Sequence, residues 1–220
     1  MIRLTRAQVR EIDRRATEEY HIPGIVLMEN AAKAATGLAL RLMNDHATSS
    51  AVIFCGGGNN GGDGLAIARH LHNAKMNAQI LLTVDPAKYQ DDALTNWRIV
   101  QAMGLKVDRA EPEAIKLLSN ALFIDAIFGT GLTAPPRDPF ASIVSAIKTA
   151  SCPVLAIDVP SGLDCDTGLP LGPCIRAHST ITFVAEKTGF PRAREYLGDT
   201  FVGDIGCPRE LIEQVAATTL

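Results

Sequence analysis

The sequence lacks several features that mark common classes of protein. No run approaches the roughly 18 consecutive apolar residues that a membrane-spanning helix needs, because Glu29, Asn30 and Lys33 interrupt the apolar stretch from Gly24 to Leu42. The first residues do not have the basic and then apolar layout of a signal peptide. There is no excess of positive charge either, since the net charge is -3, so charge does not indicate nucleic-acid binding. We therefore expect a cytoplasmic protein that binds neither membranes nor nucleic acid.

Familiar metal and nucleophile motifs are also missing. The five cysteines are odd in number, irregularly spaced and without a C-x-x-C pair, which argues against a disulfide framework and against a zinc site. There is no G-x-x-x-x-G-K-[ST] motif, so a P-loop ATPase is not indicated. Ser161 lacks the G-x-S-x-G elbow of an α/β-hydrolase.

Glycine, in contrast, is concentrated in one segment. Residues 55–64 read CGGGNNGGDG, between an apolar run at 51–54 and an amphipathic run at 65–76. Glycine is costly in ordered structure, and in a strand-to-helix turn its usual role is to let backbone N–H groups approach an anion, commonly a phosphate. A flexible linker is the alternative, but linkers do not join a buried strand to a periodic helix. The segment therefore favours a phosphate-binding loop.

The apolar pattern predicts alternating strands and helices. Two helices come first, one opened by a capping box of Thr5 and Gln8 and one from about Val26 to Met43. Strands are then expected at 51–55, 78–84, 105–107, 121–125, 153–158, 179–185 and 200–204, and helices at 63–76, 90–103, 112–118, 139–149 and after Pro208.

Two of these strands, 121–124 and 154–157, are apolar throughout, which is typical of a parallel strand covered on both faces. Nothing in the sequence indicates a linker or a repeat. We therefore predict a single Rossmann-like, doubly wound α/β domain over residues 1–220. Its mostly parallel sheet has helices on both faces, and two helices precede it.

Unusual polar residues follow the predicted strands, where ligands of such sheets bind. They are Asn59, Asn60 and Asp63 after the first strand, Asp125 and Asp158 at the ends of apolar strands, and Lys187 after the strand at 179–185. A second glycine loop, residues 129–135, follows Asp125. A single such aspartate would more simply cap a turn, but three loops in register favour a site.

The sequence leaves the ligand open at this point. Gly56, Gly58 and Gly61 match the dinucleotide fingerprint, which alone is weak, and Asp85 is either its ribose-binding acid or a plain turn opener. The extra amides do not belong to that fingerprint. Oxygens that face Asp125 could hold a hard cation, and the small number of carboxylates suits a monovalent one.

Three motifs together resemble one known family. They are NNGGDG at 59–64, DAIFGTGL at 125–132 and DVPSGLD at 158–164, and the likeness extends to 23–24, 27–31, 182–187 and 203–208. This pattern resembles the NAD(P)H-hydrate epimerase family, also called the YjeF N-terminal domain, over nearly the whole chain. One departure is Ala32, where the family often has glycine.

The resemblance implies a Rossmann-type enzyme that interconverts the R and S epimers of NADHX and NADPHX, cofactors hydrated at C6 of the reduced nicotinamide. It implies one potassium ion per subunit, held by Asn60, Asp125 and Ser161. The dinucleotide-binding residues would be Asn59, Asn60, Gly61, Gly62, Asp63, Gly129, Thr130, Gly131, Leu132, Thr133, Ala134, Pro135 and Asp158.

Asp158 is the expected general acid–base residue. Lys187 would position a phosphate or tune Asp158, unless it is simply a solvated lysine at a strand end. From the resemblance we also expect a homodimer formed through the N-terminal helices. A separate dehydratase would act in the same pathway, since no kinase-like dehydratase follows within the 220 residues.

Two other classes of function compete with this hypothesis. A non-catalytic dimeric scaffold, related to nucleotide or RNA processing, would keep the fold and lose the chemistry. It would have no physical need for Asn60, Asp63, Asp125 and Asp158. An ordinary NAD(P)-dependent dehydrogenase is disfavoured by the extra amides and by the second glycine loop.

Overall fold

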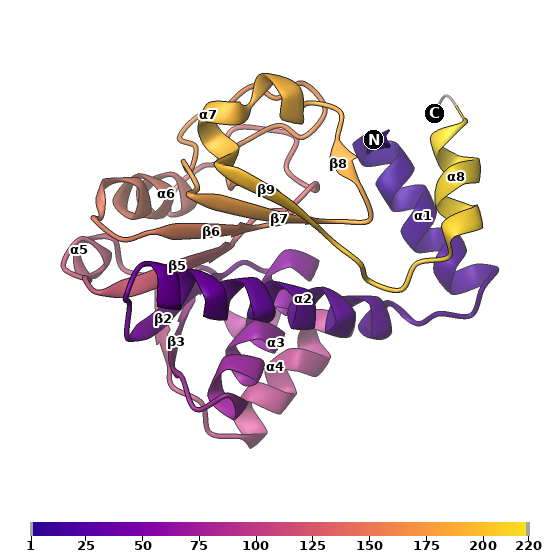
Figure 1. Cartoon of the computed structure of the whole chain (residues 1–220). Helices are drawn as coiled ribbons and strands as arrows, with labels where there is room; N and C mark the ends of the chain where they lie inside the picture. The colour runs from indigo at the N-terminus through magenta and orange to yellow at the C-terminus, as the bar shows by residue number, and fades with distance from the viewer. Residues whose placement is uncertain (1, 219–220) are drawn as a thin grey trace.

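A seven-stranded parallel sheet in the order β4-β3-β2-β5-β6-β7-β9 runs through the centre of the molecule (Figure 1). The computed structural model describes residues 2–218. The strands of this sheet are β2 (Ser50–Cys55), β3 (Asn77–Leu82), β4 (Val107–Arg109), β5 (Ala121–Ala126), β6 (Val154–Ile157), β7 (Ser179–Phe183) and β9 (Asp199–Gly203). The predicted fold class is confirmed.

Helices cover both faces of the sheet, and short elements complete the fold. The helices are α1 (Arg6–Glu18), α2 (Gly24–Asp45), α3 (Asn59–Asn73), α4 (Asp91–Ala102), α5 (Pro112–Ile115), α6 (Phe140–Thr149), α7 (Arg194–Leu197) and α8 (Arg209–Ala216). A separate two-stranded parallel sheet pairs β1 (Arg3–Leu4) with β8 (Glu186–Lys187). Of the helices described, none is both long and apolar enough to cross a membrane.

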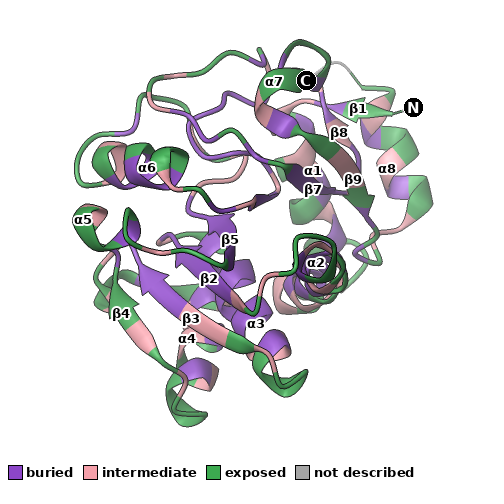
Figure 2. Ribbon diagram, turned by 60° about the vertical axis from the view of Figure 1, so that its left-hand side comes forward, coloured by how far each residue is buried: buried purple, intermediate pink, exposed green. Residues whose placement is uncertain are grey.

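Strand β2 shows how one strand serves two cores. Ile53 and Cys55 belong to the cluster under α2, α3 and α4, whereas Val52 and Phe54 belong to the cluster under α5 and α6. Successive side chains of a strand point to opposite faces, so a fully apolar strand is buried on both. Strand β5 is accordingly buried throughout and β2 is buried after its first residue, while the edge strand β4 is largely exposed (Figure 2).

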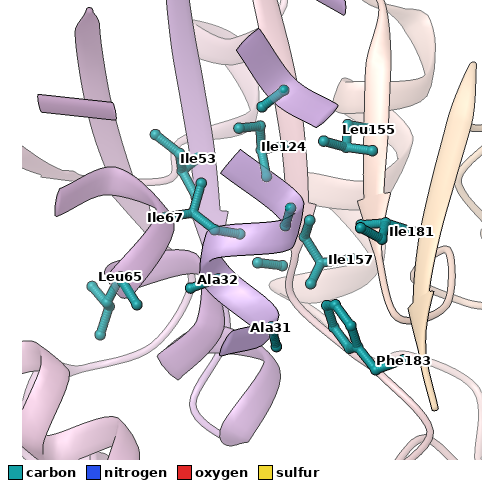
Figure 3. Close-up of a cluster of buried hydrophobic side chains, with 14 of the residues drawn as sticks. Ala31, Ala32, Ile53, Leu65, Ile67, Ile124, Leu155, Ile157, Ile181 and Phe183 are labelled. Atoms are coloured by element: carbon teal, nitrogen blue, oxygen red, sulfur yellow. The ribbon is translucent and has the colours of Figure 1, made fainter. Parts of the chain in front are cut away.

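Helix α2 packs closely on the sheet because it offers small side chains there. Ala31 and Ala32 of α2 lie in the same cluster as Ile157 and Phe183 of the sheet (Figure 3). Ala32, the departure from the family pattern, is fully buried. The residue that differs from the family therefore serves the core.

Several element boundaries differ from those predicted. Helix α3 begins at Asn59, four residues earlier than expected, so the glycine-rich segment is partly helical. Strand β4 lies at Val107–Arg109 instead of 105–107, and α5 is a single turn that ends at Ile115. The β1–β8 sheet and α7 were not predicted, because elements of two to four residues leave too short a pattern.

Close packing explains why a helix can begin in a run of glycines. A Cβ atom on Gly61 would lie 1.9 Å from the carbonyl oxygen of Gly56, and one on Gly56 would lie 2.0 Å from that of Ile127. A Cβ on Gly64 would lie 2.7 Å from the Cβ of Ala126. These glycines let the first turns of α3 sit directly against the ends of β2 and β5, and this contact outweighs their poor helix propensity.

We expect Gly61→Ala to destabilise the protein by about 3 kcal/mol or more, because its Cβ meets backbone that cannot move aside. Gly58→Ala is the matched control, since a Cβ there meets nothing within 4 Å. It should cost less than about 1 kcal/mol, the difference between glycine and alanine before a helix. Urea denaturation of both variants measures the two losses, and equal losses would contradict this account.

Candidate functional site

The polar residues singled out in the sequence gather at the carboxyl edge of the sheet. Asn60 and Asp63 lie in the first turns of α3, directly after β2. Asp125 is the penultimate residue of β5, and Asp158 directly follows β6. Lys187, on β8, reaches Asp158. The topology therefore brings together groups that are as much as 127 positions apart, from Asn60 to Lys187.

Asp125 is a fully buried carboxylate held by Ser161. The backbone N–H of Ser161 donates to Oδ2 at 2.7 Å and its hydroxyl donates to Oδ1 at 2.6 Å. Burial raises the pKa of Asp125 to about 6, against the opposing effect of the Ser161 hydrogen bonds. No basic side chain of the described residues forms an ion pair with it. A buried carboxylate without a cation is unfavourable, so this position suits a bound cation.

The side chain of Asn60 is also buried without a hydrogen-bond partner. Its side chain is 8% exposed, yet neither the amide oxygen nor the amide nitrogen has a hydrogen-bond partner. Buried amides are almost always paired. A Cβ atom on Gly129 would lie 3.5 Å from Asn60 Oδ1 and 2.8 Å from Asp158 Oδ2, so the unpaired amide faces the glycine loop and Asp158.

These groups form a suitable donor set for a hard, singly charged cation. Asn60 offers an amide oxygen, Asp125 a carboxylate and Ser161 a hydroxyl, which are the oxygen ligands that such ions prefer. Among the residues described, no cluster of three or more His, Cys, Asp or Glu could hold a metal ion. The three residues predicted as potassium ligands offer oxygen atoms of the type that this ion prefers, and their role as its ligands stays a prediction.

Asp158 accepts hydrogen bonds from three directions. The backbone N–H of Thr130 donates to Oδ2 at 3.0 Å, Thr182 Oγ1 donates to Oδ1 at 3.3 Å, and Lys187 Nζ lies 3.0 Å from Oδ1. Its backbone has φ of 65°, which is uncommon for a residue other than glycine. The strained turn directs its carboxylate back over the end of the sheet, where it is only partly buried and can meet a ligand.

Lys187 is fully buried, at 0% exposure. Its ammonium donates to Thr182 Oγ1 at 2.7 Å, to Phe183 O at 3.1 Å and to Ala185 O at 3.3 Å, besides its contact with Asp158. Its three hydrogens thus have acceptors within the protein. The interpretation of Lys187 as a solvated strand-end lysine is wrong, and no donor remains for a phosphate. The remaining prediction, that Lys187 acts through Asp158, is compatible with their 3.0 Å contact and stays a prediction.

Two more carboxylates face Asp158. Burial raises the pKa of Asp63 well above its ordinary value, and the negative charges of Asp158 and Asp13 add to the shift. Asp13, on α1, has a pKa raised to about 6, first by the surrounding protein and then by Asp158, while Lys187 opposes the shift. The side chain of Asp13 nevertheless remains exposed to solvent.

The remaining predicted residues divide into exposed and buried groups. Asn59, Gly131, Thr133, Ala134 and Pro135 are exposed, and Gly129, Thr130 and Leu132 are partly so, as ligand contacts require. Gly61 and Gly62 are buried within α3, where packing accounts for them.

Asp85 has a purely local role. Its carboxylate accepts from Ala87 N at 2.9 Å and caps the short 3₁₀ helix Pro86–Lys88. Of the two interpretations left open by the sequence, the turn opener is therefore supported.

Two residues that interact with the candidate site could not be found in the sequence. Asp13 has no distinguishing mark among the charged residues of α1. Arg6, the first residue of α1, bonds to the glycine loop through the carbonyl oxygens of Thr130 and Leu132. These partners are 124 and 126 positions away, beyond the reach of any local pattern.

A surface hollow of about 520 Å³ lies elsewhere, between α5 and α6. Its lining includes Glu113, Lys116 and Ser142 and none of the predicted site residues. None of the residues that line this hollow has a buried, unpaired polar group. The carboxyl edge of the sheet, where Asn60 is unpaired and Asp125 is buried, is therefore the better candidate for a ligand site.

Fold and site together define a Rossmann-like α/β domain with a ligand site at the carboxyl edge of its sheet. Residues 24–189 match the family model described as YjeF-related protein N-terminus. The chain belongs to this family. The family hypothesis drawn from the three motifs is confirmed.

Similar proteins include a "NAD(P)H-hydrate epimerase" of Rhodopirellula baltica, 38% identical, with 96% of this chain and 87% of that protein aligned. A "Bifunctional NAD(P)H-hydrate repair enzyme Nnr" of Moorella thermoacetica is 40% identical, but this chain spans only 42% of its length. The crystal structure of the yeast protein ynu0 has a TM-score of 0.86 at 23% identity and covers 98% of this chain and 93% of its own. That last likeness concerns the fold.

We expect Lys187→Met to destabilise the protein by about 3–5 kcal/mol, because it leaves the Asp158 carboxylate without its buried partner. The double variant with Asp158→Asn should recover part of that loss, since it removes the unpaired charge. Urea denaturation of the single and double variants measures the coupling. Lys116→Met, which breaks an exposed pair with Glu113, is the control and should cost less than about 1 kcal/mol. Purely additive losses would contradict the pairing.

Proposed function

We propose that this chain is an NAD(P)H-hydrate epimerase, an isomerase that interconverts the R and S epimers of NADHX and NADPHX in the repair of nicotinamide cofactors. The observation that carries the proposal is the similarity to relatives named as epimerases over nearly their whole length. The polar edge of the sheet supports it, because it offers groups that can transfer protons.

The reaction inverts C6 of the hydrated nicotinamide without any oxidation. The C6–O bond breaks as the hydroxyl takes up a proton and leaves as water, while the lone pair of the ring nitrogen forms a double bond to C6. Water then adds to the other face and gives up a proton; ring opening and closure at C6 would need the same transfers. The site therefore requires one group that donates a proton and one that accepts it.

Asp158 and Asp63 suit these two roles. Asp158 is held in place by Thr130, Thr182 and Lys187 and is only partly buried, so its carboxylate can meet the ligand and exchange a proton with it. Asp63 has a strongly raised pKa, so it retains a proton to higher pH than a solvated carboxyl group. Two carboxylates whose surroundings differ in this way are the usual arrangement of an acid and a base.

A potassium ion held by Asn60, Asp125 and Ser161 is part of the proposal. When bound, it would compensate the buried charge of Asp125 and pair the amide of Asn60. Ser161 Oγ also accepts from Phe128 N at 3.0 Å, just before the glycine loop. The ion would thus fix that loop and take no part in redox chemistry.

The other partners follow from the family. The bifunctional repair enzymes are more than twice as long as the part that this chain matches. We propose that a dehydratase acts in the same pathway. A homodimeric, cytoplasmic enzyme completes the proposal, and residues 59–63 and 129–135 with Asp158 would contact the dinucleotide.

The epimerase proposal predicts faster consumption of R-NADHX when an S-specific dehydratase is present. The purified chain is added to a chromatographically resolved mixture of R and S forms, and loss of the R form is compared with the uncatalysed rate. Asp158→Asn should lower the catalysed rate by about 100-fold or more, the usual contribution of a proton-transfer group. Asp199→Asn, an exposed carboxylate at the opposite edge of the sheet, should leave it unchanged. A wild-type rate equal to background would sink the proposal.

The ion site predicts that potassium raises the melting temperature. Wild-type protein in potassium chloride should melt about 5 °C higher than in lithium chloride, as binding to the native state alone stabilises it. Asn60→Ala should lose this difference, whereas Asn59→Ala, the exposed neighbour, should keep it. Equal melting temperatures of the wild type in the two salts would remove potassium from the proposal.

A further inference from the structure

Arg6 joins three parts of the chain that are far apart in sequence. Its guanidinium donates from Nε to Thr130 O, and from Nη2 to Leu132 O at 2.9 Å and to Asp164 Oδ2 at 2.8 Å. Its backbone N–H donates to Asp166 Oδ1 at 2.7 Å. The side chain is 15% exposed. Such a set of directed bonds to carbonyls and carboxylates uses the planar fork that distinguishes arginine from lysine.

The arginine is itself held rigidly. Thr5 and Gln8 form the capping box of α1, and the backbone N–H of Thr188 donates to Leu4 O at 3.1 Å. Asp164, the carboxylate opposite Arg6, accepts from the backbone N–H of Asp166 and from the N–H and hydroxyl of Thr167. Arg6 therefore connects two fixed supports to the glycine loop.

The glycine loop has few other restraints. Gly129, Thr130, Gly131 and Leu132 belong to no helix or strand, and none of them is fully buried. Within the described residues this part of the loop is held by the Arg6 bonds and by the bond from Thr130 N to Asp158. Two weaker contacts add to them, a 3.4 Å bond from Leu132 N to Gly129 O and a 4.0 Å contact from Cys165 Sγ to Thr130 O. Ordering a loop with two glycines costs conformational entropy, so the Arg6 bonds supply much of its order.

The direction of these bonds matters for ligand binding. Arg6 donates hydrogen bonds to the carbonyl oxygens of Thr130 and Leu132 on one side of the loop. The other side faces Asp158, to which Thr130 donates its backbone N–H. The guanidinium faces carbonyl and carboxylate oxygens, so it is not a site for the phosphates of a dinucleotide.

We propose that Arg6 is a positioning residue that holds loop 129–132 ready for the nicotinamide dinucleotide, so that the start of α1 sets the affinity of a site 124 residues away. The proposal rests on the epimerase function for the identity of the ligand. Without Arg6 the loop becomes ordered only when the substrate binds, and the conformational entropy lost in that step weakens the binding. Proton transfer by Asp158 is retained once the loop is ordered.

The test compares Arg6→Gln, Arg6→Lys and Arg14→Gln. Arg14 lies on the same helix and pairs only with the exposed Glu11 and Glu18 in the described structure, so its replacement removes the same charge without touching the loop. We expect Arg6→Gln to raise KM for R-NADHX at least tenfold while kcat changes less than threefold. Arg6→Lys should fall between Arg6→Gln and the wild type, and Arg14→Gln should match the wild type.

Hydrogen exchange of the backbone amides provides a readout that needs no activity. In Arg6→Gln, exchange should rise at least tenfold in residues 129–132 and stay unchanged in β5 and β6. An equal rise through the whole chain, or unchanged exchange in the loop, would overturn the proposal, as would a loss in kcat with KM unaltered. If the wild type has no epimerase activity, the proposed function fails, while the exchange result still decides whether Arg6 orders the loop.

Discussion

The arrangement of the site depends on the hydrogen bonds and the ion pair of the buried Lys187 ammonium. A charge with no exposure to solvent is tolerated only when acceptors surround it. Here those acceptors come from the end of β7, from the turn that follows it and from Asp158. The turn places Val184 at φ of 67°, a rare conformation for a β-branched residue, and so brings Phe183 O and Ala185 O to the same ammonium. The contacts of this one ammonium group offset the backbone strain at Val184 and at Asp158.

The same lysine links the sheet to the N-terminal segment. Lys187 pairs with Leu4 in the small β1–β8 sheet, and Arg6 begins α1 two residues later. The N-terminal residues thus meet the candidate site at two points, Lys187 and the glycine loop. Figure 1 shows β8 beside the start of α1, away from the seven-stranded sheet. This segment would be superfluous to a bare doubly wound sheet, and its contacts indicate that it belongs to the site.

The sequence was sufficient for the features that depend on local pattern. Fully apolar strands identified a parallel sheet, and the order of elements then placed Asn60, Asp125 and Asp158 at one edge. The glycine-rich segment was interpreted only in part. Its glycines at 61 and 64 serve close packing, whereas the prediction emphasised approach to an anion, because steric contact with a distant backbone leaves no trace in local sequence. The burial of Lys187 and the contacts of Arg6 were beyond prediction for the same reason.

The buried polar groups also help to decide whether the protein is an enzyme or a scaffold. Asp125 is a fully buried carboxylate, and the buried amide of Asn60 has no hydrogen-bond partner. Both groups lower the stability of the protein when no ligand compensates them. Apolar residues of similar size would pack at these positions without that cost, and replacing buried polar groups in this way is often neutral or stabilising. A fold kept only for its shape gains nothing from them. A fold that binds a cation and moves protons beside it needs both, and this difference in free energy is the physical reason to prefer the enzyme.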